Sequence, residues 1–457
     1  MTIETYISKI MGLYMLLFLF TILLGIVEIC NRIRKNKVIW AGFFPCSLLY
    51  SIFGFFCTLI AYMAYDDVAD PNYWRYQDWT LQDFILQGIR TFLIWLSIGV
   101  SLYLLSEWNT LKIKRRRKRT KRVMEKIIDK KFRGMIYIVQ KGKVLHEWAS
   151  GFADLPNEIP NTTETKFASA SAGKAFVAVA ILQLIEQGKI TFEDTLGTLL
   201  DLEWNAIDKD VTVKQLLNHT SGVPNYFDEN SMNEYAKLWI DFPNYKIRKN
   251  ADLLPFFINK PMMFPKGEKF QYNNTGYVLL AMIIEKITGQ PFDEYLKKNI
   301  FEVCGMKSTG YYALDKLPAK CANHYIYCAD TDDYRTNIYS VDAKGTGAGG
   351  AFVTVKDVIR FWTHLLEGRL ISKPLVSEML CKQSGNGADA EEEYYGYGMW
   401  IINNPNGKDF AYFQGCDPGV SFLSEYNPNN GMISVLASNY GDNVWRAMRN
   451  IREVLYK

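Results

Sequence analysis

Residues 167–176 read FASASAGKAF, with two serines among small residues ahead of a lysine. The apolar run that follows predicts a long helix that starts near Ser171 and stops at Gly188, since glycine commonly ends helices. Residues three apart on a helix share one face, with Cβ atoms about 5–6 Å apart. Ser171 and Lys174 have this spacing, whereas Ser169 has no basic residue at a comparable position.

This pair carries the elements of nucleophilic catalysis. A serine hydroxyl is a weak nucleophile unless a base lies within hydrogen-bond reach. Burial of Lys174 among Ala168, Ala175 and Phe176 is expected to disfavour its charged form. A helix start also leaves the backbone N–H of Ser171 available to an oxyanion. Taken alone, however, Ser-x-x-Lys also occurs at the start of many surface helices.

A second group of polar residues stands a hundred positions later, in GEKFQYNNTGYVLLAMIIEKITG. It places Tyr272, Asn273 and Asn274 in a loop before a predicted helix. Tyr272 can pass protons between a nucleophile and a leaving group. Asn274 can hydrogen-bond a substrate carbonyl from the same loop.

Together with LLNHTSGVPNY and GAGGAFVTVKDVIRFW, these motifs resemble the class C β-lactamase-like serine hydrolases of the penicillin-binding fold, over residues 130–455. The resemblance implies a nucleophile at Ser171, its lysine at Lys174, and the family tyrosine and asparagine at Tyr272 and Asn274. It also implies acyl-enzyme chemistry with no cofactor. His219, in NHTSG, is expected to pack rather than to take part in catalysis.

The third family motif departs from the usual pattern. Family members carry Lys or His, a small hydroxyl residue and Gly, and YFQGCDPGVS puts Phe413, Gln414 and Gly415 at those places. By resemblance, the backbone N–H of Cys416 is the second oxyanion donor, and Gly415 is kept. Phe413 cannot hold a substrate carboxylate as a cation could, which favours neutral or apolar esters or amides. The alternative is that Phe413 packs inward and another group binds the carboxylate.

The pattern of predicted elements indicates an α+β fold, with an antiparallel sheet built from both termini. MIYIVQKGKVLHEWA predicts a hairpin with a Lys-Gly turn, and FAYFQG, VSFLSEY and MISVLASN predict three consecutive strands before a last helix. Two further helices are expected at TGYVLLAMIIEKITG and TVKDVIRFWTHLLEG. The sheet should be flanked by helices, with an inserted helical region between its two parts. This matches the serine β-lactamase/transpeptidase-like fold that the resemblance implies.

The first hundred residues contain three long apolar runs, Ile10–Cys30, Val38–Tyr65 and Phe84–Ser106. Crossing a bilayer takes about 20 such residues, so we predict three transmembrane helices. The expected organisation is a transmembrane region at 1–107, a polybasic linker at 108–125 and a hydrolase domain at 126–457.

The basic residues flanking these runs predict an orientation. Four lie between the first two runs, one lies between the second and third, and nine lie in KIKRRRKRTKR after the third. The positive-inside rule then puts the amino terminus outside and the hydrolase domain in the cytoplasm. The extracytoplasmic side, where many family members act, is the alternative. The basic run is interpreted as a lipid-facing anchor rather than a nucleic-acid site.

The combined prediction is an integral membrane serine hydrolase acting on a small-molecule or lipid-like substrate, with no metal, cofactor or nucleic acid. The alternatives are a cell-wall D-Ala-D-Ala carboxypeptidase or β-lactamase-type enzyme, and a non-catalytic membrane sensor. Five cysteines lie beyond the apolar runs; an odd number without paired spacings fits reduced thiols, although a Cys321–Cys328 bridge stays open. The sequence leaves the oligomeric state and the substrate undecided.

Overall fold

The computed structural model describes residues 131–228, 232, 234–385 and 393–455, and isolated positions between 82 and 121. The chain divides into two units, Met1–Arg116 and Arg117–Lys457. The first two predicted transmembrane helices lie outside the described residues, as does most of the third. Within the part of the chain that is described, no helix has the length and apolar character to cross a membrane.

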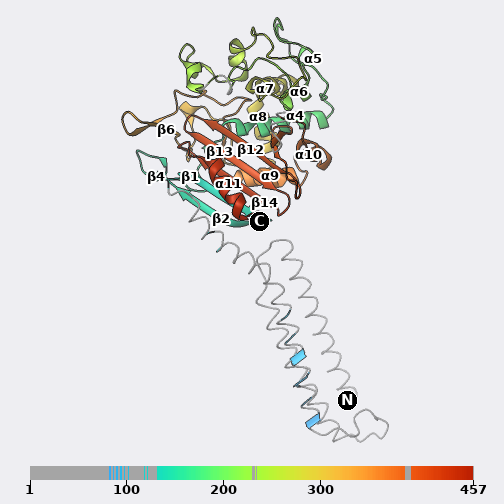
Figure 1. The fold of residues 1–457 in the computed structure, drawn as a ribbon, viewed down its shortest axis with the longest axis vertical. Helices are drawn as coiled ribbons and strands as arrows, with labels where there is room; N and C mark the ends of the chain where they lie inside the picture. The colour runs from blue at the N-terminus through green and yellow to red at the C-terminus, as the bar shows by residue number, and fades with distance from the viewer. Residues whose placement is uncertain are drawn as a thin grey trace, which may run out of the picture. The chain divides into compact units, whose positions relative to one another are not determined.

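The second unit is organised around one antiparallel sheet of eight strands in the order β2-β1-β14-β13-β12-β11-β10-β9 (Figure 1). Its first two strands come from the start of the unit and the other six from its end, and the sequence predicted such a sheet built from both termini. The strands are β1 (Gly134–Gln140), β2 (Lys143–Ser150), β9 (Ser384–Gly385), β10 (Glu393–Tyr395), β11 (Trp400–Ile402), β12 (Phe410–Asp417), β13 (Val420–Asn427) and β14 (Met432–Ser438).

The predicted Lys-Gly turn joins β1 to β2. Lys141 and Gly142 have φ of 47° and 75°, and a two-residue turn with positive φ at both positions matches the twist of a hairpin. β1 then pairs with β14 along its length, from Met135 opposite Ala437 to Gln140 opposite Met432. This pairing joins the two ends of the unit into one sheet.

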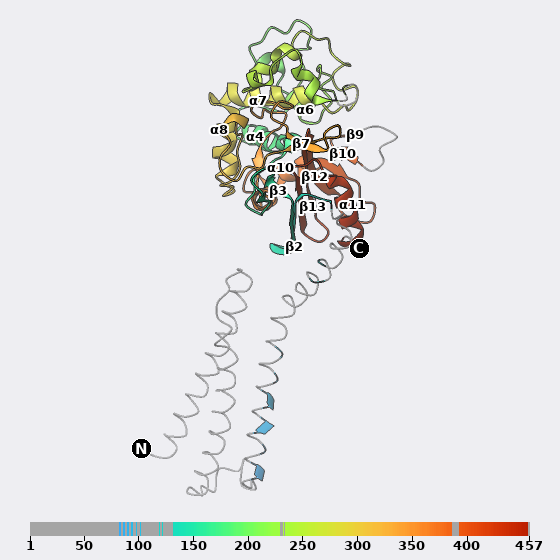
Figure 2. The same ribbon diagram turned by 90° about the vertical axis from the view of Figure 1, so that its left-hand side faces the viewer.

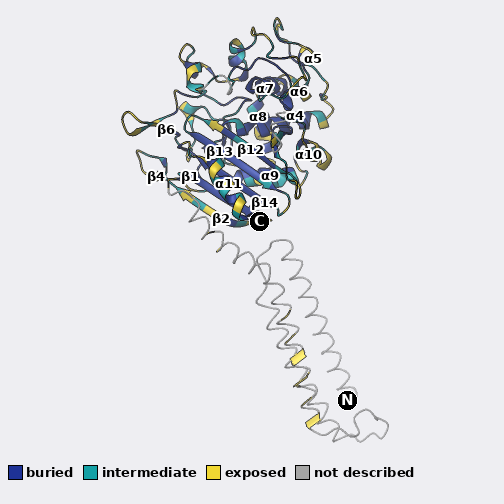
Figure 3. Cartoon of the chain, viewed as in Figure 1, coloured by how far each residue is buried: buried dark blue, intermediate teal, exposed yellow. Residues whose placement is uncertain are grey.

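Helices cover both faces of the sheet, so β1 and β14 are buried at every position and appear dark in Figure 3. One face packs against α4 (Lys174–Glu186) and α9 (Val355–Leu366), and the other against α11 (Val444–Leu455). Figure 1 shows α11 lying across the strands.

The inserted region holds most of the remaining helices. They are α5 (Leu196–Leu199), α6 (Val213–Leu217), α7 (Asn274–Thr288), α8 (Phe292–Leu296) and α10 (Lys373–Met379). Figure 2 shows α6 and α7 together at one end of the unit. Three short strand pairs complete it: β3 (Phe152–Asp154) with β4 (Ile159–Pro160), β5 (Phe167–Ala168) with β8 (Phe352–Val353), and β6 (Tyr325–Cys328) with β7 (Asp333–Thr336).

The predicted helix after residue 170 begins differently from the expectation. A 3₁₀ turn, η1 (Ala170–Gly173), precedes α4, so Ser171 lies in the turn and Lys174 is the first α-helical residue. Gly188 follows the helix with a φ of 67°, as a terminating glycine should. All five cysteines of this unit are free thiols, so the Cys321–Cys328 bridge is not formed.

Candidate active site

A sharp turn between β5 and η1 separates the roles of the two serines. Ala170 adopts a φ of 45°, a left-handed conformation that costs energy for a residue with a side chain. Before the turn, Ser169 is 1% exposed, and its N–H and hydroxyl both donate to Ala351 O at 2.8 Å. After the turn, Ser171 is half-buried and lines a cleft. The hydroxyl of Ser169 is therefore used in a hydrogen bond within the fold, whereas Ser171 lies at the cleft.

Lys174 is 1% exposed, and its side-chain nitrogen is surrounded by oxygen atoms from three segments of the chain. Nζ lies 2.9 Å from Ser171 Oγ and 2.8 Å from Asn274 Oδ1, and it also donates to Ala348 O. The predicted Ser–Lys pair is therefore in direct contact.

Asn274 reaches the lysine because the loop before α7 is held firmly. Asn273 caps the helix, its Oδ1 accepting from Gly276 N at 2.9 Å. The Nδ2 of Asn274 donates to Phe227 O at 3.0 Å, which turns Oδ1 toward Lys174. Its side chain thus contacts the lysine and a backbone carbonyl, and the predicted hydrogen bond to a substrate carbonyl stays a prediction.

Tyr272 completes the set that the sequence singled out. Its ring centroid lies 5.0 Å from Lys174 Nζ, and its ring stacks on Trp400 at 5.8 Å with an interplanar angle of 15°. Behind it, His219 is 1% exposed and packs with its ring centroid 4.5 Å from that of Tyr272. Burial, and secondarily the charge of Lys174, hold the pKa of His219 well below its usual value. His219 packs as expected.

The end of β12 contributes backbone groups beside Ser171. A Cβ on Gly415 would lie 2.2 Å from Ser169 O and 2.6 Å from Ser171 N, so only glycine fits this approach. In the β12–β13 hairpin Asp417 pairs with Val420, and Cys416 is the next position. Because hydrogen-bonded and non-hydrogen-bonded pairs alternate, the Cys416 N–H points away from β13.

That edge of β12 is open, since β11 pairs only with residues 410–412. The Cys416 N–H therefore faces the cleft from the strand that touches the Ser171 turn. Ser171 and Cys416 both line the cleft, on two segments that touch at Gly415, and their role as an oxyanion hole stays a prediction.

Phe413 does not line the cleft. It is 2% exposed and stacks on Trp362 at 5.4 Å, with Phe176 and Phe361 also in ring contact. The structure places its ring in the core between β12 and the helices α4 and α9. The physical reason is that this face of β12 is covered by apolar helix residues, and burying an aromatic ring there is favourable.

The cleft itself has a volume of about 630 Å³ and carries charged and phenolic groups that the sequence analysis missed. They include Tyr235 in a 3₁₀ turn, Arg335 on β7, Asp342 in the following loop and Asp417 at the end of β12. None stands in a recognisable motif, because these elements meet only in the folded chain.

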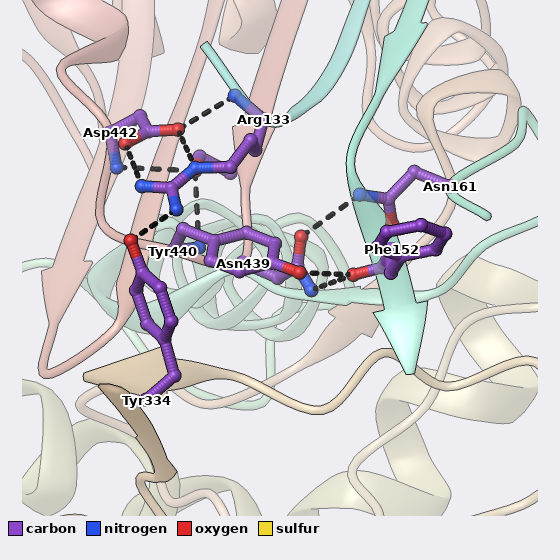
Figure 4. A network of polar contacts seen from close by, with 8 residues as sticks. Arg133, Phe152, Asn161, Tyr334, Asn439, Tyr440 and Asp442 are labelled. Carbon is purple, nitrogen blue, oxygen red and sulfur yellow. Dashed lines mark hydrogen bonds and ion pairs between the residues drawn. The ribbon is translucent and has the colours of Figure 1, made fainter. Parts of the chain in front are cut away.

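The β6–β7 hairpin that carries Arg335 is anchored through Tyr334, close to its turn (Figure 4). Arg133 makes a two-point ion pair with Asp442 and donates to Tyr334 Oη, and its guanidinium lies 4.2 Å from the Tyr440 ring centroid. These contacts tie the neighbour of Arg335 to the main sheet unit. The hairpin is thus a fixed wall of the cleft.

The family model described as Beta-lactamase matches residues 117–456. Penicillin-binding protein 4* of Bacillus subtilis (strain 168) is 29% identical over 322 residues, covering 67% of this chain and 68% of the relative. The teichoic acid D-alanine hydrolase of Staphylococcus aureus is 27% identical over 328 residues, covering 71% and 75%.

Among solved structures, a penicillin binding protein from Bacillus halodurans is 36% identical with a TM-score of 0.69, covering 74% of this chain and all of the other. The family match spans well over half of the chain, and the shared α+β architecture is that of the β-lactamases and transpeptidases. The chain therefore belongs to the β-lactamase family of serine hydrolases.

Proposed function

We propose that the protein hydrolyses an ester or amide through an acyl-enzyme on Ser171. The observation that carries the proposal is the buried Lys174 Nζ, 2.9 Å from Ser171 Oγ and 2.8 Å from Asn274 Oδ1. Ser171 Oγ attacks the substrate carbonyl while Lys174 accepts its proton. Asn274 positions the lysine. The backbone N–H groups of Ser171 and Cys416 stabilise the oxyanion.

The reaction then completes in two steps, formation of the acyl-enzyme and its hydrolysis. Tyr272 relays a proton to the leaving alcohol or amine as the tetrahedral intermediate collapses to the acyl-enzyme. Water attacks the acyl-enzyme with the same base assistance, releasing the acid and restoring the Ser171 hydroxyl. Every step uses side chains and backbone of this chain.

For the substrate, we propose an ester or small amide whose acyl part has no carboxylate. Strand β12 offers no cation, since Phe413 holds the place that a Lys or His takes in the family and lies in the core. The name of the Staphylococcus relative, a teichoic acid D-alanine hydrolase, supports an acyl group of this kind.

A peptide ending in a carboxylate is the second candidate, and Arg335 favours it. Arg335 lines the cleft, and its side chain forms no ion pair or hydrogen bond within the described residues. A D-Ala-D-Ala carboxypeptidase would release D-alanine from such a peptide, and Arg335→Gln would then raise its KM. Failure of the wild-type protein to cleave a D-Ala-D-Ala peptide excludes this candidate.

We also propose that the hydrolase domain, residues 126–457, is anchored by three membrane helices within residues 1–107 through the basic linker at 108–125. The three apolar runs and the nine basic residues after them support this. A topology reporter fused after Lys457 tests the side: activity in the cytoplasm supports the charge rule, and activity outside supports the alternative. Release of the protein by carbonate washing contradicts the anchor.

The catalytic proposal is tested by fluorophosphonate labelling of the detergent-solubilised protein. Wild type and Ser169→Ala should be labelled, and Ser171→Ala should not. Ser169→Ala is a matched control, because it removes a hydroxyl from the same stretch that faces the fold and not the cleft. Labelling of Ser171→Ala at the wild-type rate would falsify the assignment of the nucleophile.

A further inference from the structure

Asp342 is a cleft carboxylate to which the proposed reaction assigns no task. It is half-buried and lines the same cavity as Ser171. Tyr235 Oη donates to its Oδ1 at 2.9 Å, and Tyr226 Oη lies 3.4 Å from Tyr235 Oη. No lysine, arginine or histidine of the described residues forms an ion pair with Asp342. Its position is set by a phenol, and its charge has no cationic partner.

A second carboxylate approaches the same phenol from β12. Asp417 lies two residues beyond Gly415, so both project from the same face of the strand. Gly415 touches the Ser171 turn, and Asp417 lies about 7 Å farther along, in the cleft lining. Burial raises the pKa of Tyr235, and the charges of Asp342 and, to a smaller extent, Asp417 raise it further. Negative charge therefore converges on Tyr235 from two elements.

A carboxylate in this position is costly to the folded state unless a cation pairs with it. Burial raises the pKa of Asp342 to about 7, against the lowering effect of the Tyr235 hydrogen bond. A carboxylate removed from water recovers stability when a cation pairs with it. A positively charged group that enters the cleft would supply the missing partner.

We propose that Asp342, held by Tyr235 and assisted by Asp417, binds the ammonium group of an amino-bearing acyl substrate whose carbonyl lies at Ser171. This rests on the proposed acyl-enzyme function and names its substrate class: aminoacyl esters or amides with a free amino group and no carboxylate on the acyl part. An alanyl group has both properties. Asp342 is then a specificity-determining residue and does not touch the reacting atoms.

The test compares two esters of glycerol that differ only in the acyl group, D-alanyl and propionyl. Glycerol release by the full-length protein in detergent is measured at pH 7.5, with Ser171→Ala as the blank. Wild type should prefer the alanyl ester roughly ten- to hundredfold in kcat/KM, as expected for a charge-assisted hydrogen bond. Asp342→Asn should remove this preference by raising KM for the alanyl ester alone.

Two further variants guard the interpretation. Asp201→Asn changes an exposed carboxylate outside the cleft lining and should keep the full preference. Tyr235→Phe removes the donor to Asp342 and should lose only part of it. Unchanged propionyl ester hydrolysis in each variant reports that the catalytic site is folded.

The possible outcomes distinguish failure of the proposed ammonium site from failure of the proposed acyl-enzyme function. Equal rates on the two esters in wild type, equal loss on both in Asp342→Asn, or an inert alanyl ester with Ser171 still labelled by fluorophosphonate each overturns the ammonium site alone. Absence of both hydrolysis and Ser171 labelling overturns the acyl-enzyme proposal itself.

Discussion

Lys174 and Asp342 are both ionisable side chains in one cleft, and they are held in opposite ways. The side-chain nitrogen of Lys174 contacts three oxygen atoms from η1, α7 and the loop at Ala348. Asp342 accepts one hydrogen bond from Tyr235 and forms no ion pair within the described residues. The contrast teaches that the protein itself holds the catalytic groups in place. The charge of Asp342, by our proposal, gains its cationic partner only when a ligand binds.

The largest effect should follow removal of the fully bonded member of this pair. Lys174→Ala removes the proposed base, and we expect kcat to fall by about 10²–10⁴-fold, with the sheet intact by circular dichroism. Turnover of an ester by the purified variant is the measurement. Full activity in Lys174→Ala would show that the lysine is structural.

A smaller effect is expected when the nucleophile is displaced without changing any reactive group. Gly415→Ala places a Cβ 2.6 Å from Ser171 N, and a shift of about 1 Å can cost roughly 10²-fold in rate. The matched control is Gly276→Ala, whose Cβ meets its nearest atoms at 3.6 Å and should leave kcat unchanged. Equal activity of the two variants would contradict the close approach of β12.

The charge of Asp342 should reduce the stability of the folded protein at high pH. Its pKa is raised to about 7 in the folded chain from about 3.9 in an unfolded one, so the folded state binds the proton more tightly. Stability is then lost as pH rises from about 4 through 7. Asp342→Asn removes this loss, and its free energy of unfolding should exceed that of wild type by about 1–2 kcal/mol at pH 8 and little at pH 4.

Urea unfolding of the two proteins at both pH values makes the comparison. The phenol of Tyr235 stays neutral throughout this range, because its pKa is raised well above its usual value. A stability difference that does not change with pH would mean that Asp342 carries no destabilising charge.

The smallest effect concerns the β6–β7 hairpin, which forms one side of the cleft. Tyr334→Phe removes the hydroxyl that Arg133 donates to, which should cost about 0.5–1.5 kcal/mol in unfolding. The looser hairpin should raise KM a few-fold and leave kcat unchanged. Tyr339→Phe, at a tyrosine that is 75% exposed, is the control. An equal rise in KM in Tyr339→Phe would show that the contact between Arg133 and Tyr334 does not shape the cleft.

Local patterns along the chain were enough for much of the fold. The β1–β2 turn, the three terminal strands and the helices α4, α7 and α9 lie where periodicity and turn residues predicted them. The eight-stranded order and the short strands β6 to β11 were not predicted, because strands of two to four residues carry little pattern of their own.

The residues of the candidate site also differ in how far the sequence predicted them. Ser171 and Lys174 are three residues apart, so helical geometry alone brings them together. Tyr272 and Asn274 were found through a family resemblance, and their contacts with Lys174 span a hundred residues. For Phe413 the sequence left two orientations open, since a strand residue can face either side of a sheet and only the packed helices select one.

Sequence therefore specified the family, the order of the elements and the reactive residues that stand at motif spacing. The tertiary structure alone decided that Phe413 faces the core, that the edge of β12 opens on Ser171, and that Tyr235 meets Asp342 across 107 residues. The physical reason is range: motif spacing and turn chemistry act over a few residues. The charge and shape of the cleft arise where loops far apart in the sequence are packed against one another.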